Sequence, residues 1–121
     1  MDKSLSRSTD GGLRRYLDRG EVLQATMDQL RKDLALQPAD LVAPRDHLNA
    51  FEELRAQVVP VLHRLSDQGE HLLKGAMYRV DIAEPHLRRA MAAGGMPVLA
   101  GEVVLRALQK VLTRMRFAGR F

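Results

Sequence analysis

The repeat of apolar residues between positions 48 and 80 constrains the fold of this chain most strongly. The residues recur at steps of three and four positions, as Leu48, Phe51, Leu54, Val58, Val61, Leu62, Leu65, Leu72, Ala76 and Val80. This is the spacing of one face of an α-helix, and no β-strand alternation fits the stretch. The phase of the pattern persists across Pro60 and Gly69. We therefore expect one long central helix over 45–80, kinked at Pro60. A break at 66–69 that folds the chain back is the alternative.

Punctuating residues divide the rest of the chain into shorter helices. Pro38 ends a helix expected over 19–35, because the residue before a proline is pushed out of helical geometry. Pro85 and Gly94 bracket a short helix over 86–93, and Pro97 opens an amphipathic helix over 97–117. The predicted fold is all-α: an up-and-down bundle of three main helices and one short helix. Residues 13–121 form a single helical domain, and the polar stretch 1–12 forms a flexible tail.

Composition excludes several classes of function. The chain has 121 residues and no cysteine, which rules out disulfides and thiolate chemistry. No apolar run approaches the length of a membrane span or of a signal-peptide core, so we expect a soluble, cytoplasmic protein without a membrane partner. A formal net charge of +4 permits contact with an acidic partner but does not require one.

A row of basic residues on the last helix is the candidate binding site. Arg106, Lys110 and Arg114 follow one another at four-residue steps opposite the apolar face. Such a row is typical of a surface that contacts phosphates, and a Gly-Gly turn joins the last helix to the one before it. Nucleic-acid binding by this basic face is therefore the alternative function. A solvated face on an arginine-rich protein explains the row equally well.

Histidines offer a second candidate site. His63, Asp67 and His71 are four residues apart, so a continuous helix would align three potential zinc ligands. They lie opposite the apolar face, where a metal would need a second element to cover it. We expect a solvated polar face, with no metal and no cofactor. No nucleophile motif surrounds any histidine, so we expect no catalytic activity.

The expected function rests on the lengths of the predicted helices. A continuous helix over 45–80 would be about 50 Å long, roughly twice the length of either main neighbour. Part of its apolar stripe would then be exposed in a monomer, and a partner would cover it. The sequence thus predicts a small helical protein-interaction module that associates with itself or with another protein.

Overall fold

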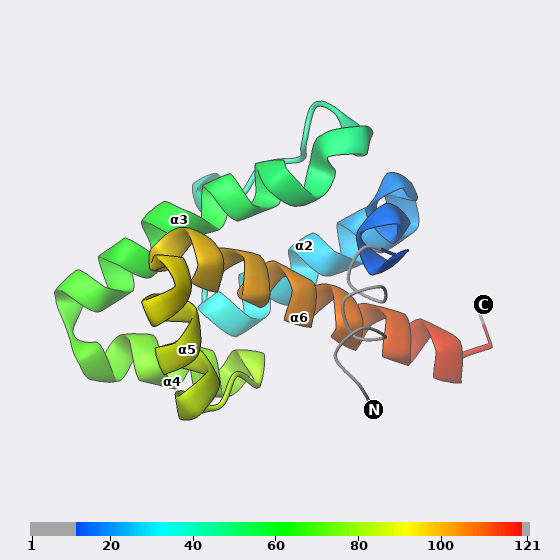
Figure 1. Ribbon diagram of the computed structural model, residues 1–121. Helices are drawn as coiled ribbons and strands as arrows, with labels where there is room; N and C mark the ends of the chain where they lie inside the picture. The colour runs from blue at the N-terminus through cyan, green and yellow to red at the C-terminus, as the bar shows by residue number, and fades with distance from the viewer. Residues whose placement is uncertain (1–11, 120–121) are drawn as a thin grey trace.

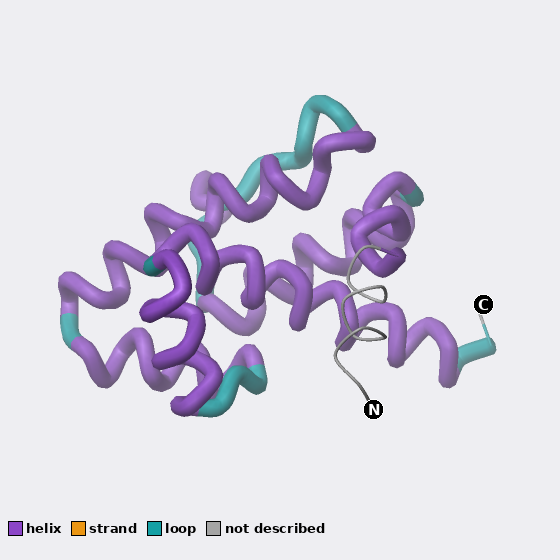
Figure 2. Tube along the Cα trace, in the orientation of Figure 1, coloured by secondary structure: helices purple, strands orange, loops and turns teal. Residues whose placement is uncertain are grey.

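The computed structural model describes residues 12–119, and these residues are 84% helical without a strand, which confirms the all-α class (Figures 1 and 2). Residues 1–11 of the predicted tail and the chain end at 120–121 lie outside the described residues. A short helical stretch at 12–14 precedes η1 (Arg15–Asp18), α2 (Gly20–Leu34), η2 (Pro38–Asp40), η3 (His47–Asn49), α3 (Ala50–Gln68), α4 (Glu70–Val80), α5 (Glu84–Gly94) and α6 (Met96–Phe117). The described part of the chain thus holds more helices than the three main and one short helix predicted.

Helix ends fall near the positions that the sequence indicates. The helices predicted over 19–35, 86–93 and 97–117 correspond to α2, α5 and α6. Pro85 lies in the first turn of α5, and Gly95 ends that helix at φ 79°, where glycine meets no Cβ penalty. Arg19 is the N-cap of α2 and makes no side-chain hydrogen bond that caps the helix.

The continuous central helix is wrong, because the chain leaves helical geometry at Gly69 (φ 157°, ψ 137°). Its N–H closes α3 by donating to the Leu65 carbonyl at 3.1 Å, and its own carbonyl accepts from Leu72 N–H at 3.0 Å to open α4. A Cβ at Gly69 would lie 2.8 Å from Cε1 of His71. The helix does continue through Pro60, as expected. Figure 2 shows the interruption at the vertex where α3 meets α4.

The break also changes which residues of α4 face the core. Through α3 the predicted face is buried, although Leu65 is only half-buried at its edge. In α4 the buried residues are Leu73, Ala76, Met77 and Val80. Leu72, expected inside, is exposed in place of Leu73. Ala76 and Val80 are buried as predicted, so the helical phase is wrong only at the start of α4, next to the break.

The true centre of the molecule is α6, which packs against α2, α3, α4 and α5 (Figure 1). Its buried residues lie nearly all round the helix: Met96, Leu99, Ala100, Val103, Val104, Leu105, Ala107, Leu108, Val111 and Met115. Gly101 allows α3 to approach closely, since a Cβ there would lie 3.2 Å from Cδ of Arg55. With α4 folded back, no 50 Å helix overhangs the described bundle, and the length mismatch that suggested a partner disappears.

Candidate functional site

The predicted basic row lies against α2 and α4, and its middle residue is largely buried. Only 16% of the Lys110 side chain is exposed. Its Nζ donates to Oδ2 of Asp33 at 2.9 Å and to the Arg79 carbonyl at 2.8 Å. Asp81 Oδ2 lies 3.6 Å from the same ammonium. All these partners belong to the protein itself, so the charge of Lys110 is used within the fold.

The neighbours of Lys110 extend this contact into a polar network that joins three helices. Gln29 Nε2 donates to both Asp33 carboxylate oxygens at 3.0 Å, and Arg114 donates to Gln29 Oε1 at 2.6 Å. The Asp33 carbonyl accepts from Nε of Arg79 at 2.8 Å. Among the described residues, no buried side-chain polar atom lacks a partner. Such complete pairing is what makes a buried charge tolerable.

Arg106 is half-buried, whereas Arg114 is the exposed member of the basic row. The Arg106 Nη2 lies 3.6 Å from Oδ2 of Asp81, and its Nη1 donates to Gln109 Oε1 at 3.4 Å. The structure therefore brings the three predicted basic residues to the seam between α6, α2 and the end of α4. Sequence reasoning missed Asp33 and Gln29. The available signal was that Asp33 comes three residues after Leu30 and so falls on the core face of α2.

The histidines do not converge on one another. His63 and Asp67 are exposed on α3, whereas His71 lies beyond the break on α4. In the described range no group of three or more His, Cys, Asp or Glu side chains is placed to hold a metal ion. His47 is exposed in η3 rather than packed on the apolar face, and Nε2 of His86 lies 2.9 Å from Oε1 of Glu102, linking α5 to α6.

A groove of about 600 Å³ lies between α4 and α5, and we call it the α4–α5 groove. Its apolar residues are Leu73, Leu87, Met91 and Met96. Met91 is 37% exposed, and the other three are buried beneath it. Ser66, from the end of α3, also lines the groove. Among the four apolar residues, Met91 therefore supplies most of the apolar surface that is open to a partner.

Charged residues of both signs form the rim of the groove. Glu84, at the start of α5, lies 3.3 Å from Nζ of Lys74 on α4 and 3.1 Å from Nη1 of Arg88. Lys74 also lies 3.9 Å from Glu70. These pairs connect the two helices across the turn at 81–83, so the groove is formed before any partner arrives.

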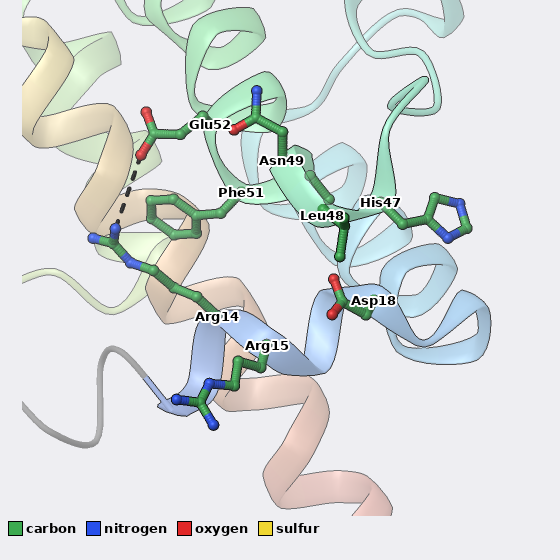
Figure 3. Close-up of a pocket in the computed structure, with 9 residues that line it drawn as sticks. Arg14, Arg15, Asp18, His47, Leu48, Asn49, Phe51 and Glu52 are labelled. Carbon is green, nitrogen blue, oxygen red and sulfur yellow. Dashed lines mark ion pairs between the residues drawn. The ribbon is translucent and has the colours of Figure 1, made fainter.

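A second hollow, the end cleft, lies between η1 and the start of α3 and measures about 370 Å³ (Figure 3). Arg14 holds one side of it: its guanidinium stacks 4.0 Å from the centroid of the Phe51 ring and lies 3.8 Å from Glu52. Leu48 stands on the opposite rim with 86% of its surface exposed. Asp18 faces Leu48 across the opening (Figure 3).

Comparison with protein-family models, with curated proteins and with solved structures finds no match to this chain. Among the described residues, no helix combines the length and the apolar character needed to cross a membrane.

Proposed function

We propose that this protein is a protein-interaction module that binds an apolar helical segment of another protein in the α4–α5 groove and carries out no reaction. The observation that carries the proposal is a partly exposed methionine, Met91, in a groove whose other apolar lining residues, Leu73, Leu87 and Met96, lie just below the surface. Grooves between helices commonly take the apolar face of an amphipathic helix, whose anchors recur at three- and four-residue steps.

The chemistry of the groove suits such a ligand. Methionine side chains are unbranched and polarisable, so two of them in one floor adapt to different apolar anchors. The rim offers acidic Glu70 and Glu84 beside basic Lys74 and Arg88. Charges of both signs orient a partner helix that carries the complementary pattern, and they favour one direction of binding over the other.

Nucleic-acid binding has less support from the geometry. Lys110 and Arg114 direct their donors at Asp33 and Gln29, so engaging a phosphate would require breaking the network. Arg106 lies beside Asp81, so only the exposed Arg114 has no acidic partner within the described residues, and one such cation leaves a weak electrostatic footprint. Nucleic-acid binding by the basic face stays a prediction of the sequence that no contact among the described residues favours.

A photo-crosslinking amino acid placed at position 91 tests the groove in the cells from which the protein comes. The control is the same probe at Ala93, which is exposed on α5 but lies about 200° around the helix from Met91. We expect a discrete crosslinked protein from position 91 and none from position 93. The same products from both positions, or no product from position 91, would reject the groove.

Binding of the captured segment then gives a quantitative test. Met91→Glu places a charge on the apolar floor, so we expect the Kd of the segment to rise at least tenfold. Ala93→Glu adds the same charge to the other side of α5, so we expect the Kd to stay within about twofold. Isothermal titration calorimetry measures both values, and equal losses would mean that charge rather than the groove determines binding.

A further inference from the structure

The end cleft displays Leu48 on a segment that is held by side-chain contacts to its backbone. Glu53 accepts from the backbone N–H groups of Arg45 and Asp46, each at 3.1 Å. The Asp46 carboxylate in turn accepts from Leu48 N–H at 3.0 Å. A large apolar side chain that is both exposed and fixed loses little conformational freedom on binding. Leu48 is therefore presented in a fixed position at the rim of the cleft.

The segment before it is fixed to α3 in the same way. Gln57 clamps Val42, accepting from its N–H at 2.7 Å and donating to its carbonyl at 3.0 Å. Arg64 binds the Asp40 carboxylate at 2.9 Å, and this guanidinium holds the pKa of Asp40 below its usual range. The connector from Pro38 to Asn49 is therefore attached along α3 at several points.

The charges around the cleft are balanced, but two of them lack a charged partner within the described range. Arg14 pairs with Glu52, whereas Arg15 and Asp18 form no ion pair with another described residue. Both are exposed on the same 3-10 turn (Figure 3). A patch that offers one cation, one anion and no net charge does not attract a strongly charged partner. It is, however, complementary to itself when rotated by 180°.

We propose that the end cleft binds a second copy of this chain in a two-fold dimer. Each copy's Leu48 enters the other's cleft, and each Arg15 pairs with the Asp18 of the other copy. A two-fold interface pairs one patch with itself, so these two contacts occur twice. The local neutrality of the patch matters because two copies with a net charge of +4 repel each other elsewhere. This dimer is independent of the α4–α5 groove.

The dimer is weak, because the cleft is small and interfaces of modest area are transient. Sedimentation velocity should show a monomer at low micromolar concentration and a dimer fraction that grows toward several hundred micromolar. Leu48→Asp should raise the dimer Kd at least tenfold. Tyr78→Asp adds the same charge at a residue that is 83% exposed and outside the cleft, and it should leave the Kd within about twofold.

Mixing two charge-reversed variants tests the two-fold symmetry itself. Arg15→Asp and Asp18→Arg should each be monomeric alone, because like charges then meet twice across the interface. In an equimolar mixture, opposite charges meet at both contacts, so the two variants should associate with each other about as well as the unmodified chain does with itself. Circular dichroism checks that each variant keeps its helices.

Three results would overturn the dimer. One is a monomer at every concentration up to about 500 µM, where even a weak specific interface would populate the dimer. Another is a dimer whose Kd is indifferent to Leu48→Asp. The third is a mixture of the two charge-reversed variants that stays monomeric. None of these results bears on crosslinking at Met91, so the dimer and the groove succeed or fail separately.

Discussion

Lys110 shows that a charged side chain in a basic row can neutralise a buried acidic residue of the same protein. Its partner Asp33 is only 6% exposed, and a buried carboxylate without a counter-charge is costly. The three donors of an ammonium suit the site, where two acceptors lie within hydrogen-bond distance and the Asp81 carboxylate lies nearby. We infer that this pair fixes how α2, α4 and α6 meet.

A double-mutant cycle on Asp33 and Lys110 measures that role. Lys110→Met strands a buried carboxylate and Asp33→Asn strands the ammonium, so each should lower the free energy of unfolding by about 3–5 kcal/mol. The double variant should lose less than the sum, with a coupling of about 1–3 kcal/mol by urea denaturation.

The exposed pair Glu84 and Arg88 provides a matched control, with Glu84→Gln and Arg88→Met. Its members are also ion-paired but lie at the surface, so we expect a coupling of about 0.3–0.5 kcal/mol. If the Asp33–Lys110 coupling were as small as this control, Lys110 would be an ordinary surface residue. Its charge would then be available to an outside partner.

At the scale of single elements, the sequence predicts helices well where local chemistry decides them. Proline and glycine bracket α5, and the apolar face of α3 has a regular repeat. The break at Gly69 was open to sequence reasoning only as an alternative, because a glycine on the apolar face fits a helix and a turn equally. Packing of α4 against α2 and α6 decides between the two, and such long-range contacts leave no mark on the local pattern.

The same limit applies to the candidate sites. The basic row was visible as spacing, but the acids that neutralise it come from α2 and from the end of α4, far away in the chain. The α4–α5 groove was not visible at all, because it depends on how the chain turns at 81–83 and on Ser66 and Met96, which the neighbouring helices bring to it.

The sign of the stability change in Gly69→Ala distinguishes a turn from a helix. Alanine should cost about 1–3 kcal/mol, because L residues rarely adopt this backbone conformation and the new Cβ would press on His71. In a continuous helix the same substitution would stabilise by about 1 kcal/mol. Urea denaturation measures the difference. Repeating it in a His71→Ala background removes the contact with the ring and isolates the backbone contribution.

At the scale of the whole molecule, the packing of α4 against the other helices depends on the reversal of the chain between α3 and α4. It carries Arg79 back to Asp33 on α2, and it brings Ser66 at the end of α3 to the groove that α4 and α5 form across the turn at 81–83. Because of the reversal, no long apolar helix face is left exposed among the described residues. Association of the protein would therefore depend on specific surface sites and not on covering an exposed part of the core.

The distance between spin labels on α3 and α4 tests this reversal most directly. The chain has no cysteine, so Ala56→Cys and Tyr78→Cys give two unique label sites at exposed positions. Ala56→Cys with Asp67→Cys, both exposed on α3, calibrates the labels at about 17 Å. Because α4 folds back beside α3, pulsed electron resonance should give a separation between positions 56 and 78 well below the helical distance (Figure 1). A separation of about 33 Å, the length of an unbroken helix between these positions, would contradict the reversal and the packing of α4 against α2 and α6.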